Sequence, residues 1–151
     1  MLVYRLSNKE EIEVLFETKD ISDICRCFTP SKKLNNFKYD KNTKYIHFYK
    51  DFESTFYLDL SKDKYICIYD IPELTLERHK GIGLYLDREF MNRLDMVKEY
   101  AIPSEEMDYS YLKSVTRVTD TIDFDDYLED NYIDKLEKVR VPIQKTLRIV
   151  R

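Results

Sequence analysis

Three polar side chains occur inside segments that otherwise predict β-strands, and they are the residues best placed to do chemistry. They are Arg5 near the start of the chain, His47 between two tyrosines, and Glu99 in an apolar segment. A guanidinium can hold an anion, an imidazole can move a proton, and a carboxylate can stabilise developing positive charge. Each residue also has a plainer interpretation, as a hydrogen-bonded or solvent-facing side chain on a half-buried sheet.

Several common kinds of active site are excluded by residues that the sequence lacks. Its two glycines, Gly81 and Gly83, cannot form a P-loop or a Rossmann fingerprint, each of which needs several glycines at fixed spacing. No Gly-x-Ser-x-Gly elbow is present, which argues against a hydrolase triad. The carboxylates of Asp123, Asp125 and Asp126 are clustered as at the start of a helix, where they complement its dipole.

Cysteine usage and the N-terminal residues favour a cytoplasmic protein. Cys25 and Cys27 are too close in sequence for an ordinary disulfide, and a third cysteine, Cys67, leaves an odd number. With two histidines, His47 and His79, the set is poor for zinc, so we expect buried free thiols and no metal. We also expect neither a signal peptide nor a membrane span.

Length and composition predict a single α+β domain covering residues 1–151. Hydrophobic residues make up 43% of the chain and charged residues 36%, which supports a core beneath a strongly solvated surface. The net charge of −4 argues against a general nucleic-acid binder.

Apolar periodicity predicts strands and helices that alternate early and strands that crowd the second half. Ser7 with Glu10 predicts a capping box for the first helix, and Gly81 is expected to end a later one. The order favours a mixed or mostly antiparallel sheet with helices at one side. Strands are expected at 2–6, 45–49, 65–69, 83–86, 97–102 and 111–118, and helices at 7–16, 21–28, 51–60, 72–81 and 124–136.

A lysine-rich loop at 31–44 contains two aromatic residues, Phe37 and Tyr39. Basic and aromatic residues together could grip a phosphate or single-stranded nucleic acid, and a loop of this length could act as a lid. A merely solvated loop is the alternative.

The order of these features resembles the ADP-ribosyltransferase-like superfamily. Its members have an Arg or His in an early strand, an aromatic strand followed by a helix, and a Glu in a late strand. Here the corresponding segments are Tyr4-Arg5-Leu6, then 45–49 with its helix, then 97–103. The resemblance covers residues 2–118, with an acidic helix and a basic tail in 119–151.

This resemblance implies a compact domain with split mixed or antiparallel sheets that binds NAD as a substrate. It implies Glu99 and His47 as catalytic residues, and Arg5, Tyr4 and Tyr49 as NAD-binding residues. The strands of Arg5, His47 and Glu99 should then lie side by side. The implied activity is ADP-ribosyl transfer to a protein or nucleic-acid acceptor, or NAD glycohydrolysis.

Two departures from the family pattern suggest a second hypothesis. Ile46-His47-Phe48 stands where many members have Ser-Thr-Ser, and Val97 stands where transferases acting on Arg or Asn carry a second Glu or Gln. The alternative is a non-catalytic binding or inhibitor module from a bacterial or phage genome. Such a module would use exposed tyrosines, the 31–44 loop and the acidic helix from Asp123 to recognise its partner.

Overall fold

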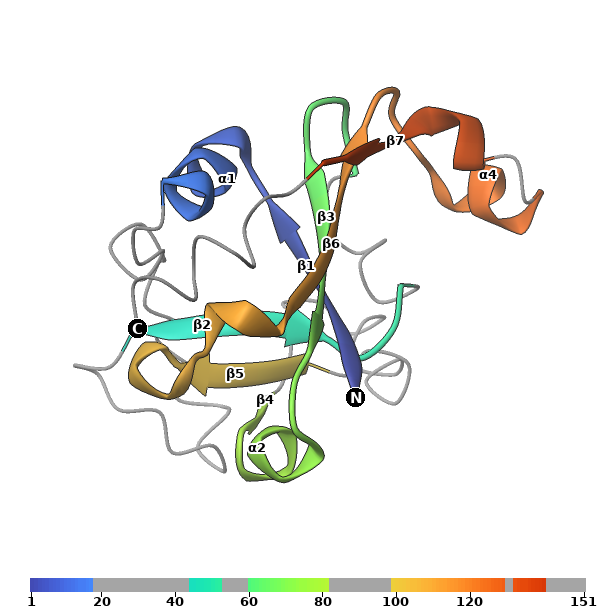
Figure 1. Cartoon of the computed structure of the whole chain (residues 1–151). Helices are drawn as coiled ribbons and strands as arrows, with labels where there is room; N and C mark the ends of the chain where they lie inside the picture. The colour runs from blue at the N-terminus through green and yellow to red at the C-terminus, as the bar shows by residue number, and fades with distance from the viewer. Residues whose placement is uncertain (18–43, 53–59, 82–98, 130–131, 141–151) are drawn as a thin grey trace.

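The computed structural model describes residues 1–17, 44–52, 60–81, 99–129 and 132–140. These segments form an α+β fold built on a seven-stranded sheet in the order β4-β5-β2-β1-β3-β6-β7 (Figure 1). Every strand pairing among them is antiparallel, which is the second of the two sheet types expected from the sequence. None of the described helices is long and apolar enough to cross a membrane.

One half of the sheet is a long antiparallel ladder. Strand β1 (Leu2–Ser7) pairs along its whole length with β3 (Tyr65–Asp70). Strand β3 pairs on its other side with β6 (Leu112–Val118), and β6 pairs with β7 (Leu136–Val139). Alternation puts apolar residues of all four strands on the face that the helices cover.

The other half of the sheet contains β2 and β5. Strand β2 (Tyr45–Tyr49) pairs residue by residue with β5 (Glu99–Pro103), and the short β4 (Lys80–Gly81) extends β5 on its far side. In Figure 1, β2 and β5 run across the view, whereas β3 and β6 run up it.

The two halves meet at a narrow junction between β1 and β2. A single register pair, Tyr4 opposite Tyr49, joins these strands. Instead of the two split sheets that the resemblance implies, the described strands form one sheet that is almost divided at this point.

Two helices cover the core face. Helix α1 (Lys9–Phe16) places Ile12 and Leu15 in the core, and α2 (Glu73–Arg78) contributes Leu76. Short 3₁₀ turns, η5 (Ser104–Glu106) and η6 (Tyr109–Tyr111), connect β5 to β6.

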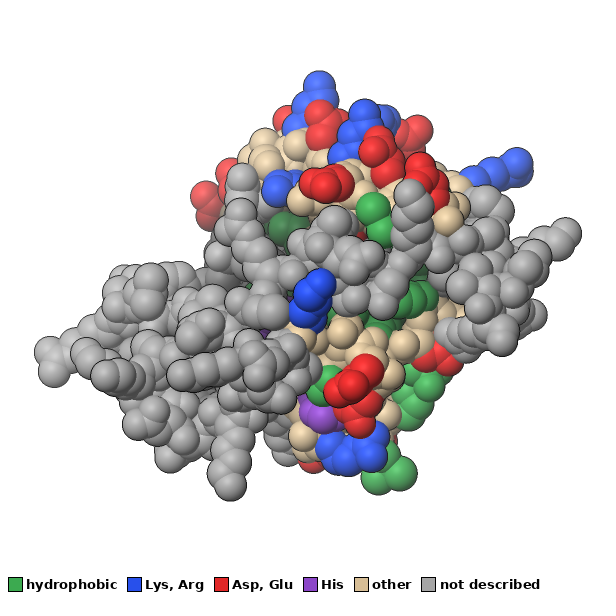
Figure 2. Space-filling view, turned by 90° about the vertical axis from the view of Figure 1, so that its left-hand side faces the viewer, with side chains coloured by type: hydrophobic (Ala, Val, Ile, Leu, Met, Phe, Trp, Pro, Cys, Tyr) green, Lys and Arg blue, Asp and Glu red, His purple; other side chains and the backbone are tan. Residues whose placement is uncertain are grey.

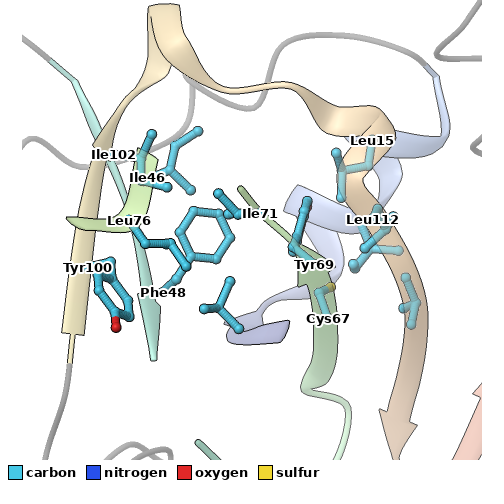
Figure 3. Packing of buried hydrophobic residues seen from close by; sticks show 13 residues of the cluster. Leu15, Ile46, Phe48, Cys67, Tyr69, Ile71, Leu76, Tyr100, Ile102 and Leu112 are labelled. Carbon is cyan, nitrogen blue, oxygen red and sulfur yellow. The ribbon is translucent and has the colours of Figure 1, made fainter. Parts of the chain in front are cut away.

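The main core lies between these helices and the sheet. Figure 3 shows the Phe48 ring near its centre, with Tyr100 and Leu76 on one side and Tyr69 on the other. The Phe48 and Tyr69 rings meet edge to face, with their centroids 5.1 Å apart, a favourable aromatic geometry. A smaller cluster on the opposite face is formed by Leu60, Ile66, Val118 and Ile122, with Tyr4, Leu6, Phe52, Tyr132 and Leu136 packed against it.

The predicted cap of the first helix was wrong by one residue. Asn8, not Ser7, is the N-cap, and its side chain accepts a hydrogen bond from the Glu11 amide over 2.9 Å. Ser7 stays in β1 opposite Tyr65 and is buried. The strand ladder extends one residue further than expected, so the cap moves to the next residue that can accept the bond.

The predicted end of the helix at Gly81 was also wrong. Helix α2 ends at Arg78, with His79 as its C-cap, and Gly81 lies in β4 opposite Glu99. Pairing with β5 thus takes over the residues that would have formed the last helical turn.

The late helix is much shorter than predicted. Helix α4 (Phe124–Leu128) is capped by Asp123 and is followed by a 3₁₀ turn, η7 (Tyr132–Lys135). Leu136 begins β7 instead of continuing a helix, because pairing with β6 packs Leu136 and Val139 against the two clusters. The 119–151 segment therefore contributes a strand to the same sheet as the 2–118 region.

Other predictions lie outside the described residues: the helix at 21–28, the 31–44 loop except Lys44, most of the 51–60 helix, the 83–86 strand, Val97, Cys25 and Cys27. The observed β2 and β3 confirm the strands predicted at 45–49 and 65–69.

Candidate active site

A row of side chains crosses the junction between the two halves of the sheet. Tyr4 lies opposite Tyr49, and Tyr49 lies opposite Glu99, so β1, β2 and β5 contribute one residue each. Directly opposed residues of antiparallel strands place their side chains on the same face. His47 is two residues before Tyr49 on β2 and shares this face. The structure therefore brings four of the five predicted site residues together, and it confirms that the three strands are neighbours.

His47 and Glu99 are in direct contact within this row. The Nδ1 atom of His47 is 2.6 Å from Oε1 of Glu99, and the Glu99 side chain is only 7% exposed. With a carboxylate at this distance, we assign the Nδ1 proton to the hydrogen bond with Glu99. This contact orients the His47 ring, with Nδ1 directed at Glu99.

Arg5 supports the site from the other face of the sheet. It lies opposite Cys67 of the main core, and its Nε donates a hydrogen bond of 2.6 Å to Glu11 of α1. Its Nη1 also donates to the backbone carbonyl of His47 over 2.9 Å. The guanidinium therefore joins α1, β1 and β2 at the point where β1 and β2 share a single register pair.

This arrangement bears on the predicted NAD-binding role of Arg5. The side chains of Arg5 and Glu11 are 14% and 7% exposed, so the pair is shielded from solvent. Arg5 reaches His47 through the backbone and does not lie in the row with Glu99. Binding of NAD phosphates by Arg5 would require Glu11 to release it.

Glu11 is a functional candidate that the sequence reasoning missed. Its position four residues before Leu15 places it on the same helical face as a fully buried residue. A carboxylate on a buried helical face needs a charged partner, and the preceding strand carries the Arg5 guanidinium six residues earlier. This spacing was the available signal.

The second histidine of the chain also contacts a glutamate. His79 follows α2, and its Nε2 touches Oε2 of Glu106 in η5, although Nε2 is buried without hydrogen-bond geometry to any described group. The Glu106 side chain at this contact is 38% exposed, so solvent reaches the carboxylate. Arg78 lies 4.0 Å from the same carboxylate. Figure 2 shows a histidine flanked by acidic and basic side chains in its lower part, at the height of α2.

Buried polar groups also line the core side of β1. The Cys67 thiol donates to the Ser7 hydroxyl over 3.6 Å, and burial raises the pKa of Cys67 to about 12. Burial likewise raises the pKa of Tyr69 well above its usual range. Cys67 is thus a protonated, unreactive thiol, as expected for a buried free cysteine.

Within the described segments, no three His, Cys, Asp or Glu side chains are close enough together to hold a metal ion. Searches of protein families, curated proteins and solved structures find no match to this chain.

Proposed function

We propose that this chain cleaves the nicotinamide–ribose bond of NAD and passes ADP-ribose to an acceptor or to water. The observation that carries the proposal is the contact of His47 with the buried carboxylate of Glu99, in one row with Tyr49. It adds to the resemblance of the sequence to the ADP-ribosyltransferase-like superfamily, which motivates NAD as the substrate.

Glu99 has the chemistry that the bond cleavage needs. As the bond breaks, its electron pair leaves with neutral nicotinamide and the ribose acquires oxocarbenium character. A nearby carboxylate stabilises this positive charge in a shielded site far better than water does. One oxygen of Glu99 is bonded to His47, and we assign the other to the ribose.

His47 and Tyr49 supply the remaining parts of the proposed mechanism. His47 holds Glu99 in place, and its Nε2 can take the proton that the acceptor loses when it attacks the ribose. The Tyr49 ring lies on the same face beside Glu99, and we assign it to stacking on the nicotinamide, with Tyr4 next to it on β1.

Replacing Glu99 by Gln tests this proposal directly. Nicotinamide release from labelled NAD should fall at least about 100-fold in Glu99→Gln, because the charge is lost while the shape is kept. Glu106→Gln is the matched control, since Glu106 also contacts a histidine but is exposed, and it should keep wild-type turnover. Absence of both turnover and NAD binding in the wild-type protein would rule the proposal out.

A non-catalytic binding module is the second candidate, and one observation favours it. Leu128 and Ile133 are 65% and 70% exposed at the α4–η7 end of the molecule, beside acidic residues. Exposed apolar side chains ringed by charge are typical of protein-binding surfaces. This candidate predicts that Leu128→Ser/Ile133→Ser weakens capture of a basic partner, whereas Glu99→Gln has no effect on it.

A further inference from the structure

A groove lies far from the candidate active site, at the other edge of the sheet. Its volume is about 420 Å³, within the range of small-molecule sites. Helix α1 forms one wall, and β3, β6 and β7 form the other. In the order of the sheet, β2, β1 and β3 separate β5, which carries Glu99, from β6. The groove is lined by Lys9, Ile12, Glu13, Phe16, Tyr65, Arg117, Glu137, Lys138, Val139 and Arg140.

The lining of the groove is positively charged, although the protein is acidic overall. Four cations and two carboxylates line it, whereas the whole chain has a net charge of −4. Glu137 pairs with Arg117, and Glu13 approaches Lys9 at 4.0 Å. The upper part of Figure 2, at the height of α1, shows basic and acidic side chains interleaved.

Two of the four cations remain without a carboxylate partner. Among the described residues, no Asp or Glu lies within ion-pair distance of Lys138 or Arg140, and both side chains are exposed. They are two positions apart, with Lys138 in β7 just before its last residue, Val139, and Arg140 directly after the end of β7. Two adjacent cations at the lip of a groove favour a ligand with a compact, doubly charged anion.

The walls of the groove are apolar and partly aromatic. Ile12 and Phe16 come from the same side of α1, and Tyr65 and Val139 face them from the sheet. Phe16 remains 37% exposed at the end of its helix, so its ring is available to a ligand. A flat ring between Phe16 and Tyr65 would bury aromatic surface on both of its faces.

We infer that this groove binds a small organic phosphate that carries a flat aromatic ring, of the nucleoside monophosphate class. The ring occupies the space between α1 and β3, and the phosphate lies against Lys138 and Arg140. This site is independent of the proposed NAD chemistry at Glu99, because no residue is shared between them.

Titration with AMP at low salt tests the inference. AMP should bind saturably, and Lys138→Ala/Arg140→Ala should weaken its binding at least about tenfold. Lys50→Ala/Lys113→Ala removes the same charge from exposed positions outside the groove and should leave AMP affinity unchanged. Adenosine and inorganic phosphate, which each carry one half of the ligand, should bind more weakly than AMP. Raising the salt concentration should weaken the binding of inorganic phosphate and AMP, and it should leave the binding of adenosine unchanged.

Phe16→Ala distinguishes the contribution of the ring to binding from that of the phosphate. It should reduce the affinity for AMP and adenosine but not for inorganic phosphate. Because Phe16 is partly exposed, the variant should fold, and circular dichroism checks that it does.

Three outcomes would overturn the inference. They are no saturable AMP binding at about 1 mM, an unchanged affinity in Lys138→Ala/Arg140→Ala, and loss of AMP binding in Glu99→Gln with the groove variants unaffected. The last result would place AMP at the proposed NAD site instead. Failure of NAD cleavage alone leaves the groove inference intact.

Discussion

Both histidines of this chain contact a glutamate, and the two pairs differ mainly in how deeply the glutamate is buried. Glu99, beside His47, is 7% exposed, whereas Glu106, beside His79, is 38% exposed. Both glutamates belong to one short stretch, at the beginning of β5 and just after its end. The buried Glu99 carboxylate depends on His47 for a hydrogen bond, whereas water can hydrogen-bond to the exposed Glu106 carboxylate. Burial of the carboxylate, more than the pairing itself, therefore distinguishes a candidate site from a surface contact.

The largest expected effect on stability comes from removing Arg5, which supports the His47–Glu99 pair (the inner pair, with His79–Glu106 as the outer pair). Arg5→Met removes the charge that neutralises Glu11 and the donor to the His47 carbonyl, leaving a buried carboxylate without a partner. We expect the free energy of unfolding to fall by about 3 kcal/mol, measured by urea denaturation. Arg78→Met, at the outer pair, should cost less than about 0.5 kcal/mol. Equal costs for the two variants would contradict the distinction.

Replacing each histidine by alanine should also destabilise the protein more at the inner pair than at the outer pair, with a smaller difference than for the arginines. His47→Ala leaves Glu99 shielded and without its 2.6 Å partner, so we expect a loss of roughly 2 kcal/mol. His79→Ala leaves Glu106 in contact with solvent and should cost well under that amount. Thermal and urea unfolding of both variants measure the difference, and a larger loss for His79→Ala would reverse our assignment.

The sequence predicted most of the neighbourhood of the inner pair, for a physical reason. In β2 and β3, apolar residues either alternate with polar ones or form a continuous run, and turn residues flank each strand. The predicted bounds of both strands are therefore nearly correct. Arg5, His47 and Glu99 are predicted site residues because they interrupt such strands. The pairing of β5 with β2, more than 50 residues apart in the chain, could be expected only from the family resemblance.

The sequence failed to predict the segments in which the same residues could form either a helix or a strand. Ile133 and Leu136 fit a helical spacing, but η7 and β7 form there because β6 offers an open edge. Glu11 looked like an ordinary acidic residue in a first helical turn, because a local pattern cannot show that Arg5 approaches it from the sheet. The face that each side chain takes was equally hard to predict: Arg5 on β1 and Glu99 on β5 are separated by β2 and lie on opposite faces of the sheet.

Thiol chemistry provides a probe of the core side of the same junction. Cys67 lies opposite Arg5, and burial raises its pKa to about 12 from 9.0. Because the thiol pKa is higher in the folded state, its contribution to stability is fully present when the pH is below the pKa of the unfolded chain. This contribution is lost as the pH rises from about 9 towards 12. In a Cys25→Ser/Cys27→Ser background, labelling of Cys67 at pH 8 should be at least about 100-fold slower in the native protein than in denaturant. Equal rates would show that this side of the sheet is open.

The smallest effect concerns an ion pair far from both histidines. Lys135 donates to Asp126 over 2.7 Å, and this bond lowers the pKa of Asp126. The lowered pKa means that Asp126 favours the fold above its ordinary titration range and that this contribution is lost on acidification. Lys135→Ala should raise the pKa of Asp126 towards its usual value, measured by carboxyl-carbon NMR, with almost no change in stability at neutral pH. An unchanged titration would show that the capping box with Asp123 alone sets the value.

The single register pair between β1 and β2 has a consequence for how the molecule opens. Hydrogen bonds of β1, β3 and β6 form one cooperative ladder, and those of β2 and β5 form another, with little backbone hydrogen bonding between them. Amide hydrogens in the two ladders should therefore exchange with solvent as two groups, each with its own opening free energy. The Arg5 guanidinium spans the boundary, so its loss should uncouple the two groups before either one unfolds.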